Sequence, residues 1–297
     1  MNRIAGCEYD TAMFTNLTQD HLDYHKTMEK YALAKQNLFK MLRNNKYAII
    51  NNDDKYKEYF LLKENNNITY SFTKGDYYIK DYQITSSHST FKVINKNKEY
   101  TFTTKLLGKH NIYNSLASII VLNKIGYSFE EINNVLTIVS GPKGRMENIS
   151  YNNNNIIIDY AHTPDGIANV LKTAKELKPN QIITIMGCGG GTGSDREKRS
   201  TMGKLVLELS NKTIFTNDNP RDEEPNQIIN DLLKEKTNNN YIIELDRKKA
   251  IERGIKMLTN NDILLILGKG HENYQIIRNK KTHFSDKETV EEIIKEN

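Results

Sequence analysis

Acidic and imidazole side chains are concentrated near the start of the chain. Asp20, His21, Asp23 and His25 stand within a short stretch ahead of a periodic segment. Carboxylate oxygens and imidazole nitrogens bind divalent cations, so one interpretation is a metal site. The other is that these residues cap the following helix or interact with its dipole. Because their spacing matches no standard metal motif, the residues taken alone favour the second interpretation.

In the second half of the chain, polar residues follow directly on short apolar runs. They are Asp159 with His162, and the segments 187–199, 218–221 and 268–272. The segment 187–199 is a glycine-rich turn before a helical pattern, where backbone N–H groups can receive an anion. Ligands of parallel sheets bind outside the carboxyl ends of the strands. The sequence therefore predicts a site in this half.

Hydrophobic periodicity predicts the elements that must position these residues. In the first half it predicts a helix over 27–42 that contains Lys35, a strand over 46–51, further strands between 68 and 104, and helices over 111–125 and 128–138. In the second half, apolar runs alternate with amphipathic stretches, which predicts a mostly parallel sheet with helices on both faces. The asparagine tracts 152–155 and 238–240 are interpreted as polar loops.

Composition limits the class of protein. The chain has 297 residues, enough for two domains, which we predict to span 1–141 and 142–297. Its net charge of +5 is dispersed, which argues against nucleic acid as a partner. Cys7 and Cys188 lie far apart, so neither a disulfide framework nor a zinc site is expected. The absence of a long apolar run argues against a membrane partner, and a cytoplasmic location is expected.

Two consecutive segments resemble a known family. TNLTQDHLDYH (15–25) followed by MEKYALAKQNLF (28–39) is similar to the central-domain signature of the Mur ligases, in particular the UDP-N-acetylmuramoyl-tripeptide synthetases. The resemblance implies an α/β fold, with a partial central ATP-binding domain followed by a Rossmann-like C-terminal domain. It also implies that His21 helps bind Mg²⁺ and that Lys35 is carbamylated. A carbamylated lysine would supply an anionic oxygen ligand, whereas an unmodified one would repel the metal.

Further segments extend the resemblance to an ATP site. In GKHNIYNSLAS (108–118), Asn114 corresponds to a family residue that contacts adenine, with Asn111 beside it. Arg145 corresponds to an arginine that meets the ATP phosphates, and Asp159 to a position near the ribose. A guanidinium suits phosphate because its N–H donors are forked. Without the resemblance, Arg145 would be interpreted as a surface salt-bridge residue.

The remaining motifs resemble the family's amino-acid site. Arg196 is our match to the arginine that binds the incoming amino acid, with Arg199 as the competing choice. The motif Asp218, Asn219, Pro220 and Arg221 marks family members that add meso-diaminopimelate, and Gly268 and Glu272 correspond to residues that contact it. A second substrate carboxylate calls for a fixed cation, here Arg221, which L-lysine would not need.

The resemblance implies an ATP-dependent ligase of peptidoglycan synthesis, acting in cell-wall formation, cell shape and cell division. ATP would phosphorylate a carboxylate of UDP-N-acetylmuramoyl-L-alanyl-D-glutamate, and the diaminopimelate amine would attack the resulting acyl phosphate, with Mg²⁺ as cofactor. The 297 residues contain no GxxxxGK[ST] phosphate loop. We therefore expect an N-terminal part to be missing and the chain to be inactive alone. The alternatives are an L-lysine-adding homologue, a folylpolyglutamate synthase relative, and a non-catalytic binding module.

Overall fold

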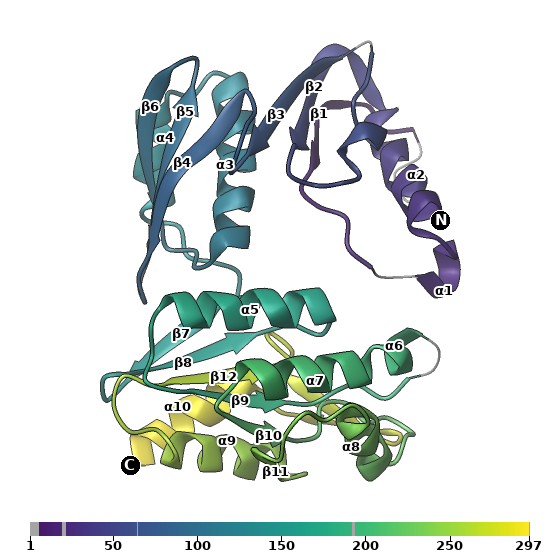
Figure 1. Ribbon diagram of the computed structural model, residues 1–297, viewed down its shortest axis with the longest axis vertical. Helices are drawn as coiled ribbons and strands as arrows, with labels where there is room; N and C mark the ends of the chain where they lie inside the picture. The colour runs from purple at the N-terminus through teal and green to yellow at the C-terminus, as the bar shows by residue number, and fades with distance from the viewer. Residues whose placement is uncertain (1–5, 20–21, 64, 192–193, 297) are drawn as a thin grey trace. The chain divides into compact units, whose positions relative to one another are not determined.

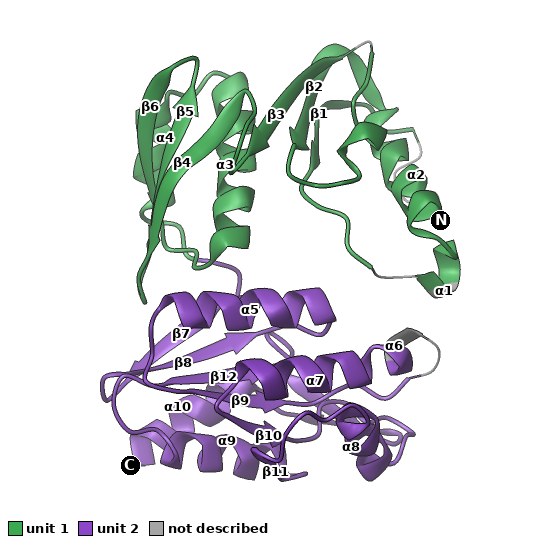
Figure 2. Ribbon diagram, viewed as in Figure 1, with its two compact units in different colours: residues 1–140 green, residues 141–297 purple. Residues whose placement is uncertain are grey.

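The computed structural model describes residues 6–19, 22–63, 65–191 and 194–296. The chain divides into two compact units, unit 1 (Met1–Ser140) and unit 2 (Gly141–Asn297) (Figure 2). His21 and Asp20, two residues of the predicted metal cluster, lie outside the described residues. In the part of the chain that is described, no helix is long and apolar enough to cross a bilayer.

Unit 1 is built on a six-stranded sheet in which the strands follow their order in the sequence. The strands are β1 (Tyr9–Phe14), β2 (Leu42–Asn51), β3 (Asn66–Ser71), β4 (Tyr77–Ile84), β5 (Ser89–Asn95) and β6 (Lys98–Thr104). β1 to β4 pair in parallel and β4 to β6 antiparallel. The helical segments are α1 (Leu22–His25), α2 (Met28–Phe39), η1 (Lys57–Tyr59), α3 (Lys109–Lys124) and α4 (Phe129–Leu136). The strands expected between 68 and 104 are confirmed.

The first predicted helix is shorter than expected. Thr27 is its N-cap, with the hydroxyl accepting the backbone N–H of Lys30 at 3.2 Å. The helix ends at Phe39, and Leu42 instead begins β2, where it pairs with Tyr9. The expected extension to residue 42 is wrong because the parallel ladder with β1 provides the hydrogen bonds that a further helical turn would have used.

The helix predicted over 128–138 is confirmed, together with its N-terminal cap. Ser128 accepts the backbone N–H of Glu131 at 3.2 Å, and the Glu131 carboxylate accepts the backbone N–H of Ser128 at 2.8 Å. This reciprocal capping box satisfies two N–H groups that have no partner within the helix. It starts α4 at Phe129, as the sequence indicated.

Unit 2 is built on a sheet of strand order β11-β10-β9-β12-β8-β7, parallel except for β7. The strands are β7 (Glu147–Tyr151), β8 (Asn154–Asp159), β9 (Ile182–Met186), β10 (Lys212–Phe215), β11 (Tyr241–Ile243) and β12 (Ile263–Leu267), with a separate hairpin of β13 (Tyr274–Ile277) and β14 (Lys280–His283). The helices are α5 (Pro164–Glu176), α6 (Ser194–Glu197), α7 (Arg199–Leu209), α8 (Pro225–Leu233), α9 (Arg247–Lys256) and α10 (Asp286–Glu296).

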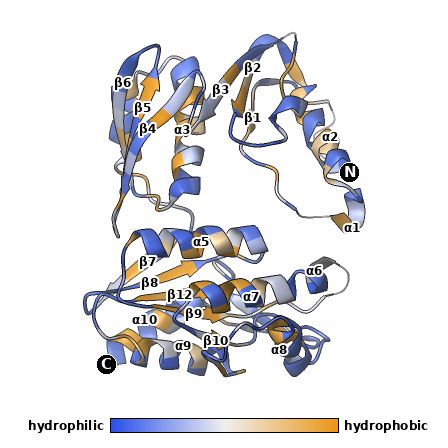
Figure 3. Ribbon diagram, viewed as in Figure 1, coloured by the Kyte–Doolittle hydropathy of each residue, from blue (hydrophilic) through white to orange (hydrophobic). Residues whose placement is uncertain are grey.

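Helices cover both faces of the unit 2 sheet, as predicted (Figure 1). From β8 through β9 and β10 to β11 the chain moves across the sheet in one direction, so right-handed connections place α5, α7 and α8 on one face. The return from β11 to β12 places α9 on the other face, where α10 joins it. The central strands β9 and β12 are buried along their whole length and are the most apolar part of the unit (Figure 3).

One sequence interpretation in unit 2 is corrected by the structure. The asparagine tract 152–155 is not a loop throughout: Asn154 and Asn155 begin β8, and only Asn152 and Asn153 form the turn from β7. Their φ angles are 45° and 60°, as a tight two-residue hairpin turn requires. Asparagine tolerates this left-handed conformation better than most residues, which explains the tract.

Candidate functional site

The predicted site residues of unit 2 gather where its central strands end. β8 ends at Asp159, and the turns after β9, β10 and β12 carry Gly187, Asp218 and Gly268. The backbone N–H of Gly268 donates to the carbonyl of Asp159 at 3.1 Å. A Cβ on Gly268, where φ is +110°, would stand 2.5 Å from Oδ2 of Asp218, and one on Gly187 would stand 2.9 Å from the Asp218 nitrogen. The turns approach so closely that only glycine fits there.

A buried polar cluster occupies this edge of the sheet. Nζ of Lys269 lies 3.3 Å from Oε2 of Glu272, 3.3 Å from Oδ1 of Asn219 and 3.7 Å from Oδ1 of Asp218. Nδ2 of Asn219 donates to Oε2 of Glu272 at 2.8 Å. Burial raises the pKa of Asp218, while the positive charges of Arg247 and Lys269 act in the opposite direction. The structure thus brings together three predicted residues, Asp218, Asn219 and Glu272.

Arg221 has a fixed backbone and an exposed side chain. Its φ is +53°, its N–H donates to the carbonyl of Ile276 at 3.0 Å, and its carbonyl accepts the N–H of Arg278 at 2.6 Å. One guanidinium nitrogen donates to the carbonyl of Gly190 in the glycine-rich loop. The β13–β14 hairpin therefore holds the backbone of Arg221 in a conformation that is uncommon for a non-glycine residue, and its charge lies beside the loop.

Arg221 and Arg196 line the same cavity. Its volume is about 650 Å³, and its wall is made by Gly190, Gly191, Arg196, the run Pro220–Glu224 and Gln227. The cavity therefore carries two arginines from two segments of the chain, α6 and the turn after β10. Guanidinium groups bind carboxylates through paired, charge-assisted hydrogen bonds.

The structure places Arg196, our match, and Arg199, the competing choice, in different surroundings. Arg199 is completely buried, and its guanidinium donates to Glu223, to Asp231 and to the carbonyl of Gly189 at 2.7 to 2.9 Å. The side chain of Arg196 is 50% exposed and pairs with Asp231, with 2.9 Å from Nε to Oδ2. Arg199 therefore stabilises the glycine-rich loop through its hydrogen bond to the Gly189 carbonyl. Arg196 is the arginine that a ligand could reach.

Asp159 and Arg145 lie next to this edge, on β8 and on the turn before β7. The carboxylate of Asp159 accepts the backbone N–H groups of Met146 and Ala161, both at 2.7 Å, and burial raises its pKa. The guanidinium of Arg145 is exposed and lies 4.8 Å from the centroid of the Tyr160 ring. Asp159 thus fixes the turn that carries Arg145, and Arg145 presents its charge to solvent.

The predicted adenine residues lie at the start of α3 in unit 1. Nδ2 of Asn111 donates to the carbonyl of Leu107 at 2.8 Å, and Asn114 is exposed one turn later, 3.4 Å from Oδ1 of Asn111. Asp53 fixes this end of the helix by accepting the Tyr113 hydroxyl at 2.6 Å. Burial of Asp53 opposes its ionisation, but hydrogen bonds, led by that from Tyr113, hold its pKa below the ordinary value.

The predicted metal residues are only partly described. Lys35 is exposed on α2, with Nζ 5.0 Å from the centroid of the Tyr31 ring. Among the described residues, no group of three or more His, Cys, Asp or Glu side chains could hold a metal ion. An unmodified Lys35 carries a positive charge that would repel a cation, so the described side chains alone do not form a metal site.

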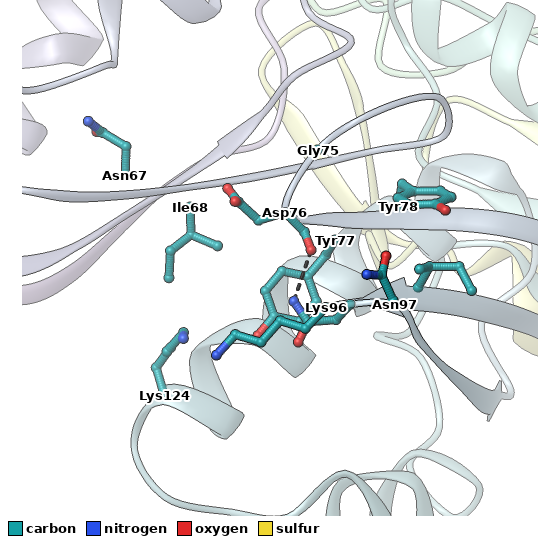
Figure 4. Close-up of a pocket in the computed structure, with 11 residues that line it drawn as sticks. Asn67, Ile68, Gly75, Asp76, Tyr77, Tyr78, Lys96, Asn97 and Lys124 are labelled. Atoms are coloured by element: carbon teal, nitrogen blue, oxygen red, sulfur yellow. Dashed lines mark hydrogen bonds between the residues drawn. The ribbon is translucent and has the colours of Figure 1, made fainter.

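A separate hollow of about 360 Å³ lies in unit 1, at the start of β4, the turn between β5 and β6 and the end of α3 (Figure 4). Lys96 and Lys124 border it, and Nδ2 of Asn95 donates to the carbonyl of Asp76 at 2.9 Å. None of the predicted site residues lines this hollow, so it is not part of the candidate site.

Two buried cations beside the site were missed by the sequence argument. Lys269 lies within the GKGHE segment, where only Gly268 and Glu272 were assigned, and Arg247 begins α9. The available signal was that Lys269 stands between two glycines just after the apolar run 263–267. In the structure both glycines have positive φ angles, and the lysine is buried. A lysine held there by backbone on both sides has little room to reach solvent.

Comparison with known proteins gives two family matches. Residues 1–122 match the Mur ligase middle domain, and residues 144–270 match the Mur ligase glutamate ligase domain. The chain is 42% identical over 303 residues to a UDP-N-acetylmuramoyl-L-alanyl-D-glutamate–2,6-diaminopimelate ligase of Bacillus cereus, covering 99% of this chain and 61% of that protein. It is 43% identical over 295 residues to the ligase of the same name from Fusobacterium nucleatum, covering 97% and 60%.

Solved structures agree with these matches. A structure of a UDP-N-acetylmuramoyl-L-alanyl-D-glutamate–2,6-diaminopimelate ligase aligns with a TM-score of 0.68 at 34% identity, covering 99% of this chain and 62% of that one. The MurF ligase of Thermotoga maritima in complex with ADP aligns with a TM-score of 0.75 at 16% identity, covering 97% and 62%, which shows a shared fold. The chain spans about three fifths of the length of the curated relatives it matches.

Proposed function

Because this chain belongs to the Mur ligase family, we propose that it carries the nucleotide-binding and amino-acid-binding parts of a ligase that joins meso-diaminopimelate to UDP-N-acetylmuramoyl-L-alanyl-D-glutamate. Mur ligases form amide bonds at the expense of ATP and act in peptidoglycan synthesis. Among amino acids, we propose diaminopimelate as the one that is added.

The observation that carries this choice is the cavity shared by Arg196 and Arg221. Diaminopimelate has two carboxylates and two ammonium groups, whereas L-lysine has one carboxylate. Two guanidinium groups on one cavity suit two carboxylates, and a single carboxylate would leave one of them without a partner. Glu272 supplies carboxylate oxygens beside the same turns, which suit an ammonium group.

The chemistry of the proposed reaction has two steps. A carboxylate oxygen of the D-glutamyl residue attacks the terminal phosphorus of ATP, and ADP leaves, which gives an acyl phosphate. The neutral amine of diaminopimelate then attacks the acyl carbon, inorganic phosphate leaves, and the nitrogen loses a proton to give the amide. Arg145, exposed at the edge of unit 2, would offset negative charge on phosphate oxygens. Asn111 and Asn114 would contact adenine from α3.

Magnesium would neutralise phosphate charge in such a reaction. His21 and a carbamylated Lys35 are the residues that we propose to hold it. Without that modification Lys35 is a cation and would repel the metal. An increase in the mass of Lys35 by one CO₂, measured in bicarbonate buffer, would support its assignment.

Binding of the amino acid tests the proposal directly. Calorimetry of the 297-residue chain with meso-diaminopimelate and with L-lysine should show a preference for the former of about tenfold or more. Arg221→Met should weaken diaminopimelate binding and leave L-lysine binding nearly unchanged, because only the second carboxylate loses its partner. Arg253→Met, an exposed arginine on α9, is the matched control. If Arg221→Met leaves the preference between the two amino acids unchanged, the choice of substrate is wrong.

Binding and turnover are separate expectations for this chain. Since its sequence contains no phosphate loop, we expect no ligase turnover from the 297 residues alone. Formation of ADP that depends on both diaminopimelate and the muramyl dipeptide substrate would contradict that expectation.

A further inference from the structure

Lys269 is a fully buried ammonium group at the edge of the candidate site. Its side chain has no exposed surface, and the atoms around Nζ are oxygens of Glu272, Asn219 and Asp218. Lysine is almost never fully buried unless it is paired. The position of Lys269 on the turn after β12 therefore places its amino group between two turns that carry proposed substrate residues.

Lys269 and the backbone N–H of Ile276 together determine which way the Asn219 amide faces. An ammonium group can only donate hydrogen bonds, so the Asn219 atom that faces it must be the oxygen. Oδ1 of Asn219 accepts from Nζ of Lys269 at 3.3 Å and from the backbone N–H of Ile276 at 2.9 Å. The reversed amide would place its NH₂ group against two donors. Nδ2 must consequently point to Oε2 of Glu272, to which it donates at 2.8 Å.

The same ammonium group also orients Glu272. Oε2 of Glu272 accepts from both Lys269 and Asn219, whereas Oε1 accepts from the Tyr274 hydroxyl at 3.2 Å. Oε2 therefore accepts two hydrogen bonds, whereas Oε1 accepts one and can accept another. The side chain of Glu272 is 16% exposed, so part of it remains accessible to a ligand.

We infer that Lys269 is a positioning residue of the amino-acid site: by fixing the Asn219 amide and one oxygen of Glu272, it presents the other Glu272 oxygen to an ammonium group of the substrate. This inference rests on the proposed function, because it takes the ligand to be an amino acid. Lys269 itself does not contact the ligand.

A double-mutant cycle tests whether Lys269 acts through Glu272. Lys269→Met should weaken meso-diaminopimelate binding, measured by calorimetry, by about tenfold or more in the wild-type background. In the Glu272→Gln background the same change should weaken diaminopimelate binding by less than about threefold, because the carboxylate that Lys269 orients is gone. Lys248→Met, in an exposed ion pair with Glu292, is the control and should change neither value. Equal losses in both backgrounds would overturn the inference.

A spectroscopic measurement tests the geometry without any ligand. In nuclear magnetic resonance spectra, the side-chain NH₂ signals of Asn219 should shift in Lys269→Met, and they should not shift in the Lys248→Met control. Should Lys269→Met fail to fold, Lys269→Gln replaces it in both experiments. If the wild-type chain binds no diaminopimelate, the proposed function fails while the Asn219 signals still report on Lys269. Unchanged Asn219 signals would overturn the inference even where binding is observed.

Discussion

The guanidinium group of Arg247 forms a bidentate ion pair with the carboxylate of Asp286, with 2.7 Å from Nε to Oδ1 and 2.8 Å from Nη2 to Oδ2. Both side chains are completely buried. The same guanidinium donates to the carbonyls of Asn217 at 3.2 Å and Leu267 at 3.0 Å, directly before Asp218 and Gly268. One buried pair therefore connects the starts of α9 and α10 to the two turns of the candidate site.

Breaking this ion pair should destabilise the chain strongly. Asp286→Leu leaves the Arg247 charge buried without its partner, which should cost about 3–5 kcal/mol of the free energy of unfolding. The double change Arg247→Met with Asp286→Leu should recover part of that loss, because a buried pair can be replaced by apolar groups at small cost, although the carbonyls of Asn217 and Leu267 lose a donor. Urea unfolding followed by circular dichroism measures both, since the chain has no tryptophan. A double variant no more stable than the single one would contradict this account.

Arg196 and Arg199 should respond in opposite ways to substitution. Arg199→Met removes a fully buried guanidinium that holds Glu223, Asp231 and the Gly189 carbonyl, and should cost about 3 kcal/mol of the free energy of unfolding. Arg196→Met should change stability little, because its ion pair with Asp231 is half exposed. Under the proposed function, Arg196→Met should instead weaken diaminopimelate binding. Urea unfolding measures the stability of both variants, and calorimetry measures their binding of diaminopimelate. A large loss of stability in Arg196→Met, with little loss in Arg199→Met, would contradict these roles.

Two adjacent glycines of the loop after β9 provide a matched comparison. A Cβ on Gly190 would stand 1.9 Å from the carbonyl oxygen of Pro220, whereas a Cβ on Gly189 would meet its nearest atom, Nη1 of Arg221, at 3.4 Å. Gly190→Ala should therefore displace the turn that carries Arg221 and lower the melting temperature, while Gly189→Ala should be tolerated. Thermal unfolding of the two variants measures the difference. Equal melting temperatures would show that the loop at Gly190 can move away from the turn at Pro220 with little loss of stability.

Much of the fold follows from local sequence patterns. The alternation of apolar runs and amphipathic stretches located the parallel strands and helices of unit 2, because a strand buried on both faces reads as a continuous apolar run. Strand β7 was missed: its residues 147–151 are only partly buried, and the sequence there shows no continuous apolar run. The extent of the first helix was also missed, because the pairing of Leu42 with Tyr9 depends on a distant strand.

The candidate site could be predicted only in part. The residues that end the strands were identifiable because ligands of α/β sheets bind there. The resemblance favoured Arg196 over Arg199, but the sequence could not show their difference in burial, which depends on acids from a later turn and helix, Glu223 and Asp231. Lys269 was not predicted as a site residue for a similar reason. Most lysines are exposed to solvent, and the burial of this one depends on contact between the turns after β10 and β12.

The pair of Glu223 with Arg199 should make stability depend on pH in the acidic range. Hydrogen bonds from Arg199 hold the pKa of Glu223 below its ordinary value of 4.5, against the opposing effect of burial. In the unfolded chain this pKa returns to 4.5, so the unfolded state takes up the proton at a higher pH. The stabilisation is therefore present above pH 4.5 and is lost as the pH falls through the folded-state pKa.

Glu223→Gln should thus be less stable than the wild type near neutral pH and should lose less stability on acidification. The slope should be reduced rather than abolished, because the pKa of Asp231 is also lowered by its arginine hydrogen bonds, despite burial, and Asp231 remains. Urea unfolding at about pH 6 and about pH 3 measures the change. Glu224→Gln, whose carboxylate is 76% exposed, is the neighbouring control and should follow the wild type. Parallel pH dependence for Glu223→Gln and the wild type would mean that the buried guanidinium gains nothing from the charge of this carboxylate.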